Sequence, residues 1–113
     1  MRRVILATIL GSGTLLLAGC GSSTITATQA GYSAVVSSDS DAITALKAKL
    51  PSNLNGATLH DGDAHSGPHI CGFNASKNGH TYQVDFYGTL PSGVNGSELC
   101  SDSVKQSFLK DTP

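Results

Sequence analysis

The sequence predicts an α+β fold in which a helix, an antiparallel sheet of two or three strands and a second helix pack together. Three observations favour this fold. Apolar residues recur at helical spacing over residues 40–50, alternating residues flank an Asn-Gly pair at 78–79, and a helix start follows Gly96. Helices laid on one face of a small sheet bury a single core. With 113 residues, the chain has room for one small domain.

The first predicted helix covers residues 40–50. Residues 38–41 supply serine and aspartate side chains, which cap a helix start and suit its positive dipole. Pro51 is expected to end the helix. The apolar residues that would share one face are Ala42, Ile43, Leu46 and Leu50.

A hairpin is predicted after a possible strand at 57–60 and a polar loop at 61–68. From His69 the pattern alternates, and it alternates again over residues 81–87. Asn-Gly between two such segments is a strong hairpin signal. The inward residues would be Cys71, Phe73 and Ala75 on one strand and Tyr82, Val84 and Phe86 on the other. Ser97 then caps a last helix, with Cys100, Val104 and Phe108 on its inner face.

The N-terminal segment is typical of a secretory signal. Arg2 and Arg3 precede an apolar run from residue 4 to residue 18. This run is shorter than the roughly 20 apolar residues that a membrane-spanning helix needs. We therefore expect a signal peptide rather than a retained membrane helix.

The run ends in Leu17-Ala18-Gly19-Cys20, which resembles a bacterial lipobox, the site cut by the lipoprotein signal peptidase. The resemblance implies that residues 1–19 are removed and that Cys20 becomes the new N-terminus, with a diacylglyceryl group on its sulfur. Two or more acyl chains, such as palmitate, hold a protein firmly on a bilayer. The expected product is a bacterial lipoprotein anchored by lipid to the cell membrane on its extracytoplasmic side.

Residues 20–38 are then expected to be a lipidated flexible tether, and residues 39–113 the folded domain. The tether segment consists mainly of small and hydroxylated residues and carries almost no charge. A short edge strand at 32–36 is the alternative for part of it.

The cysteine count follows from the lipobox resemblance. With Cys20 assigned to lipid, Cys71 and Cys100 remain, and such a pair outside the cytoplasm is expected to form a disulfide. The bond would join the hairpin to the last helix. A redox-active or metal-binding thiol pair is the alternative, although the sequence has no Cys-x-x-Cys.

The charge pattern gives nucleic-acid binding no support. Without Arg2 and Arg3, five of the seven basic residues remain against eight acidic ones, a net charge of −3. These charges are spread out and form no basic patch that could meet phosphates.

A cluster of imidazoles and carboxylates suggests a metal site. Within residues 60–69 fall three of the four histidines and two acids, and His80 could join from the next strand. Such ligands suit zinc or copper, so one of these metals is the cofactor that the segment would hold. The candidate ligands are His60, Asp61, Asp63, His65, His69 and His80. The segment starting at Asp61 partly resembles a calcium loop but has Ser66 and Gly72 where that loop needs Gly and Glu. The alternative is an ordinary solvated loop.

No signature of nucleophilic catalysis is found, and an enzyme is not expected. Tyr87 lies beside polar neighbours on the outer face of its strand, which is either a protein-docking surface or an ordinary solvated face.

The sequence predicts a small binding module that acts on a partner in the cell envelope, and this partner is expected to be a protein. The alternatives are a metal-binding lipoprotein that uses the loop from His60 to His69 and a prophage-encoded lipoprotein that excludes superinfecting phage.

Overall fold

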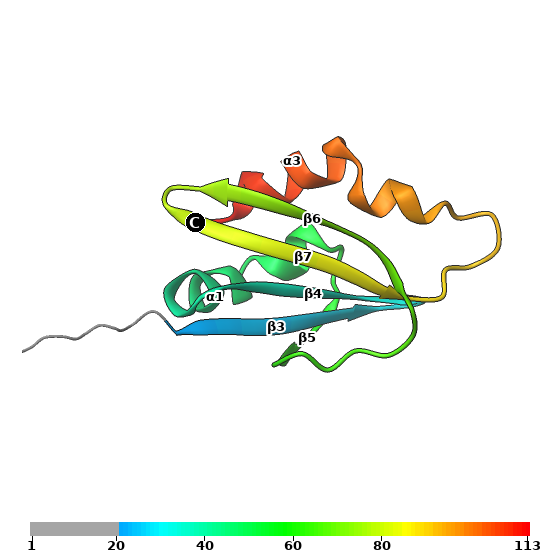
Figure 1. Cartoon of the computed structure of the whole chain (residues 1–113), viewed down its shortest axis with the longest axis horizontal. Helices are drawn as coiled ribbons and strands as arrows, with labels where there is room; N and C mark the ends of the chain where they lie inside the picture. The colour runs from blue at the N-terminus through cyan, green and yellow to red at the C-terminus, as the bar shows by residue number, and fades with distance from the viewer. Residues whose placement is uncertain (1–20) are drawn as a thin grey trace, which may run out of the picture.

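A computed structural model describes residues 21–113, so the predicted signal peptide and lipidation site at Cys20 lie outside the described residues. Five strands form one antiparallel sheet in the order β5-β3-β4-β7-β6 (Figure 1). The strands are β3 (Ser22–Gln29), β4 (Tyr32–Asp39), β5 (Thr58–Asp61), β6 (His69–Lys77) and β7 (His80–Gly88). The helices are α1 (Ser40–Lys47), α2 (Leu50–Asn53), the 3₁₀ helix η3 (Gly96–Cys100) and α3 (Asp102–Asp111).

The predicted α+β fold with two or three strands is wrong, because the sheet has five strands and strands hold more of the described residues than helices do. The missed strands are β3 and β4, which occupy the segment expected to be a flexible tether. β4 is not an edge strand either, since it pairs with both β3 and β7. Their core-facing residues include the small Ala27 and Ala34, which are fully buried but give a weak hydrophobic signal. Their Thr and Val residues suit a pleated strand.

The first helix starts as expected and ends early. Asp39 caps α1 by accepting a hydrogen bond from the Ala42 N–H at 2.9 Å. The helix ends at Lys47, and Leu50 and Pro51 begin the short helix α2 instead of closing α1. Proline lacks the N–H that a helix interior needs, but its fixed φ suits a first turn.

The hairpin is confirmed, while the last helix is divided in two. Asn78 and Gly79 join β6 to β7 with φ values of 52° and 82°, as a two-residue turn with positive φ at both positions requires. After η3, Ser101 caps α3 by accepting from the Val104 N–H at 3.3 Å. A serine at this position starts a new helix because its side chain satisfies a free N–H.

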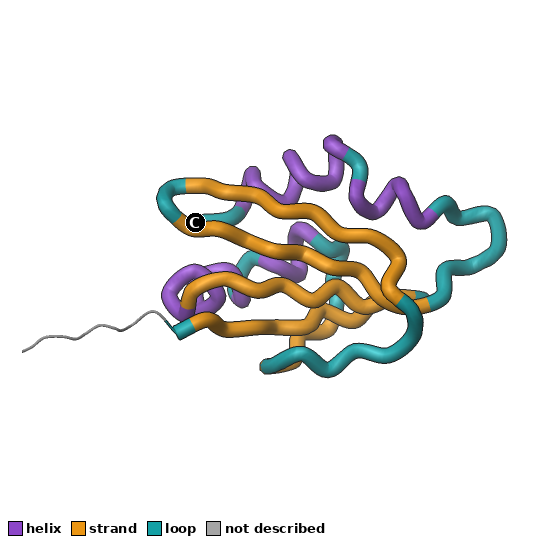
Figure 2. The backbone as a smooth tube through the Cα atoms, in the orientation of Figure 1, coloured by secondary structure: helices purple, strands orange, loops and turns teal. Residues whose placement is uncertain are grey.

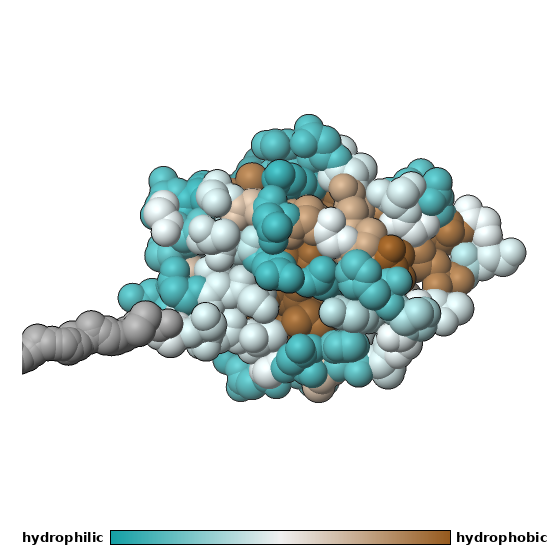
Figure 3. Space-filling model, viewed as in Figure 1, coloured by the Kyte–Doolittle hydropathy of each residue, from teal (hydrophilic) through white to brown (hydrophobic). Residues whose placement is uncertain are grey.

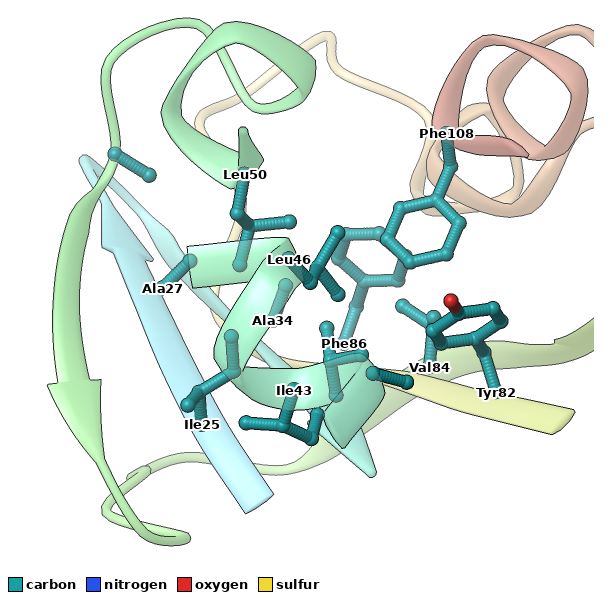
Figure 4. Packing of buried hydrophobic residues seen from close by; sticks show 13 residues of the cluster. Ile25, Ala27, Ala34, Ile43, Leu46, Leu50, Tyr82, Val84, Phe86 and Phe108 are labelled. Carbon is teal, nitrogen blue, oxygen red and sulfur yellow. The ribbon is translucent and has the colours of Figure 1, made fainter. Parts of the chain in front are cut away.

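All helices lie on one face of the sheet and cover the core (Figure 2). Figure 4 shows side chains from α1, α2 and α3 meeting those of the strands. The labelled buried residues are Ile25, Ala27, Ala34, Ile43, Leu46, Leu50, Tyr82, Val84, Phe86 and Phe108. The predicted disulfide between Cys71 and Cys100 is present and ties β6 to η3. Among residues 21–113, no helix is long and apolar enough to cross a membrane.

Candidate functional site

The two ends of the molecule differ, and three connections meet at one of them. We call the end of the sheet at which β3 starts the proximal end. The C-terminus lies at this end too (Figure 1). The opposite, distal end consists of the turn at 30–31, the loop at 62–68 and the loop at 89–95. Backbone hydrogen bonds join them: the Gly88 N–H donates to the Pro68 carbonyl at 2.9 Å, and the Thr89 N–H to the Gly31 carbonyl at 3.0 Å. The distal end is therefore one connected surface.

The loop at 62–68 runs from β5 at one edge of the sheet to β6 at the other, over the face that carries no helix. The Thr26 hydroxyl donates to the Gly62 carbonyl at 2.7 Å and accepts from the Ala64 N–H at 3.1 Å. Thr26 and its neighbour Val35 point away from the core, yet they are 0% and 5% exposed. The loop thus covers part of this face and is held by a buried hydroxyl.

Tyr87, which the sequence placed on an outer face, lies between two imidazoles. The His65 ring stacks on it at a centroid distance of 3.6 Å and an angle of 17°, and the His69 ring meets its edge at 5.2 Å. Each imidazole Nε2 also faces a carboxylate, Asp63 for His65 at 3.3 Å and Asp85 for His69 at 3.1 Å. Tyr87 is therefore half-buried and held in place.

The structure does not assemble the predicted metal ligands into one site. Asp61 pairs with Lys47 at 2.7 Å, and that partner lowers the pKa of its carboxyl. His60 lies exposed on β5. His69 stands opposite Tyr87 in the hairpin, seven residues along β7 from His80, or about 23 Å at the usual rise of a strand. Within residues 21–113, no group of three or more His, Cys, Asp or Glu side chains is placed to hold a metal ion.

His80 belongs instead to the proximal end. Its Nδ1 lies 2.6 Å from Asp39 Oδ2. The Ala42 N–H and then this imidazole hold the pKa of the Asp39 carboxyl below its usual value. The predicted ligand therefore serves the capping residue of α1.

A cleft of about 330 Å³ opens at the distal end between the loop at 62–68 and the β3–β4 turn. None of its lining residues is charged: Thr28, Gln29, Gly31, Tyr32, Ser33, Ser66, Gly67, Tyr87, Gly88 and Thr89. Glycine is required in the walls of this cleft where two backbone segments lie close together. A Cβ on Gly88, whose φ is 134°, would lie 2.6 Å from the Gly31 carbonyl oxygen. Burial raises the pKa of the Tyr32 hydroxyl above its ordinary value.

The loop at 89–95 adds an apolar residue to the distal end. Val94 is 48% exposed, and among residues 21–113 it is the one large hydrophobic residue that is exposed to solvent. Figure 3 shows apolar surface toward the end where this loop projects, next to hydrophilic surface. An apolar side chain on a protruding loop can enter a partner's pocket.

The sequence pointed to Tyr87, His65 and His69 but missed the β3–β4 half of the cleft. Thr28, Tyr32 and Ser33 fell in the segment expected to be a tether. The usable signal was the Ala30-Gly31 pair between two stretches rich in Thr, Ser and Val, which suits a two-residue turn with Gly at positive φ.

The described chain is a five-stranded antiparallel sheet with helices on one face and a loop on the other. A scan against protein-family models found no matching family, and neither the curated proteins nor the solved structures searched gave a match.

Proposed function

We propose that the chain is a bacterial lipoprotein, anchored through Cys20, whose distal end binds a protein partner in the cell envelope. The observation that carries this proposal is the position of β3. The strand begins at Ser22, two residues after Cys20, and runs toward the distal end. An anchor at Cys20 would hold the proximal end at the bilayer and leave the distal end facing outward.

This geometry also limits where the partner can be. Eight residues of β3 span about 26 Å at the usual rise of a strand. Because the folded sheet begins at Ser22, few residues separate the anchor from the domain. The partner must therefore come within a few tens of ångströms of the membrane surface.

The composition of the distal end supports protein binding. The stretch from Tyr87 to Ser97 contains no charged residue and includes the exposed Val94. Interface cores are poor in charge and rich in aromatic residues, and binding loops use Tyr, Ser, Gly and Asn. The distal end combines these features with a rigid frame of strands and backbone hydrogen bonds.

The test is an affinity capture from solubilised bacterial membranes with matched variants. The wild-type chain should recover one envelope protein. Val94→Asp should recover it at least about tenfold less, because a buried unpaired charge is costly at an interface core. Ala45→Asp, which adds the same charge on the exposed side of α1, should behave like wild type.

Cys20→Ala separates the anchor from the binding surface. This variant should take up no labelled palmitate in bacterial cells, whereas the wild-type chain should, and its purified form should still bind the recovered partner through Val94. Equal recovery by Val94→Asp and wild type would contradict the proposed surface, and palmitate uptake that is unchanged in Cys20→Ala would contradict the proposed anchor.

A further inference from the structure

The distal cleft differs from the other depressions in the described part of the chain by its chemistry. Two depressions at the proximal end include the carboxylate of Asp39. A pocket of about 90 Å³ under α3 is lined mainly by apolar residues such as Phe73 and Phe108. The cleft alone among these four combines a neutral lining with many polar groups.

Hydroxyl groups dominate this lining. Six of its ten residues carry one: Thr28, Tyr32, Ser33, Ser66, Tyr87 and Thr89. Among residues 21–113 these six hydroxyls make no side-chain hydrogen bond, in contrast to the hydroxyls of Thr26 and Ser101. A hydroxyl can donate one hydrogen bond and accept two, so the residues around the cleft carry unused donors and acceptors.

This chemistry selects among ligand classes. A charged ligand would give up hydration in a cleft that offers no opposite charge. An apolar ligand would cover the hydroxyls without satisfying them, which also costs free energy. A neutral molecule that is itself covered with hydroxyls can exchange its hydrogen bonds with water for bonds to the cleft.

We propose that the distal cleft binds a neutral saccharide, such as one sugar unit of an uncharged glycan. Its volume of about 330 Å³ equals the share of roughly eleven waters, which is more than one six-carbon sugar occupies and leaves room for such a unit. This inference goes beyond the proposed function, because it requires neither the anchor at Cys20 nor the protein partner at Val94.

The frame around the cleft reduces the cost of binding. The Thr26 hydroxyl fixes the loop that carries Ser66 and Gly67 on one wall, and backbone hydrogen bonds from Gly88 and Thr89 fix the other. A site already held in shape loses little conformational freedom when the ligand enters.

The test is a titration of the ¹⁵N-labelled full chain, kept in a detergent without a sugar headgroup. The neutral panel is maltotetraose, cellotetraose, mannotetraose and chitotetraose. The charged panel is tetragalacturonate and the deacetylated, cationic counterpart of chitotetraose. At least one neutral sugar should saturably shift the amide signals of Gly31, Gly67 and Gly88 below about 10 mM, whereas the charged sugars should not.

Matched variants locate the site. Ser66→Ala should weaken the neutral sugar about three- to tenfold, the usual worth of one hydrogen bond. Ser107→Ala removes an exposed hydroxyl on α3 and should leave the affinity unchanged. The proposal is overturned if no neutral sugar of the panel binds, if a charged sugar binds as well, or if both variants weaken binding equally. None of these outcomes bears on capture of the protein partner, so the two proposals fail separately.

Discussion

Removal of the disulfide between Cys71 and Cys100 should lower the free energy of unfolding by about 3.6 kcal/mol. The two residues are 29 positions apart in the sequence. In the chain-entropy relation, a closed loop of about 30 residues reduces the entropy of the unfolded chain by about 12 cal/mol/K, which gives this value at 25 °C. The loss would be a large share of the roughly 5–15 kcal/mol that stabilises a typical domain.

The structure indicates which elements would be destabilised by removal of the disulfide. β6 is an edge strand, paired only with β7 on one side, and η3 has no buried residue of its own. The bond is the covalent link between these two elements. Without it, η3 and the loop before it should open first, and the amides of η3 should exchange hydrogen faster than those of β4.

The assay is urea unfolding of the oxidised wild type and of the Cys71→Ala/Cys100→Ala double variant, followed by circular dichroism. The double variant should unfold at lower urea, and the reduced wild type should match it. A difference below about 1 kcal/mol would contradict this value, because it would show that the loop is already constrained in the unfolded chain.

Three further predictions concern single residues. Leu46→Ala should lower the free energy of unfolding by about 2–5 kcal/mol in the same assay, because Leu46 is fully buried on the inner face of α1; a change below this range would mean that the core collapses around the gap. Ser101→Ala should cost about 1 kcal/mol and speed amide exchange in the first turn of α3, where the Val104 N–H loses its acceptor; unchanged exchange would contradict the cap. The pKa of Asp39 is lowered by the Ala42 N–H and then by His80, so its contribution to stability is complete above its ordinary pKa of 3.8 and is lost as the pH falls through the lower folded value. Asp39→Asn should therefore flatten the acid side of the stability–pH curve, and an unchanged slope there would argue against the cap and the pairing.

Strong local signals predicted part of the fold. Asn78-Gly79 fixed the hairpin because few other residues tolerate positive φ at two successive positions. Asp39 marked the start of α1 because its side chain satisfies a free N–H. The disulfide followed once Cys20 was set aside, and the structure confirms it.

The missed strands show where sequence patterns become weak. Ala27 and Ala34 are fully buried, but alanine gives little hydrophobic contrast with the Ser and Thr residues around it. Pairing with neighbouring strands, rather than local hydrophobicity, makes β3 and β4 part of the sheet. Such pairing depends on residues far apart in the sequence, so a segment of small residues is easily mistaken for a linker.

The sequence identified several residues of the distal site, but it did not predict how they are arranged in space. Residues 60–69 do form an unusual segment, and its histidines lie near carboxylates as a metal site would suggest. The fold, however, separates them: His65 and His69 hold Tyr87, and His80 lies at the other end of the hairpin. Only the order of the strands decides which of these residues meet.

If Cys20 holds the proximal end at the membrane, the distal end should face a protein partner. Photo-crosslinking in living bacteria tests it most directly, with the photoreactive residue at Val94 or, as a control, at Ala45. We expect one discrete protein adduct from position 94, none from position 45, and labelled palmitate on the chain that forms the adduct. Equal adducts from both positions, or an adduct from position 94 on a chain without the lipid label, would contradict this arrangement.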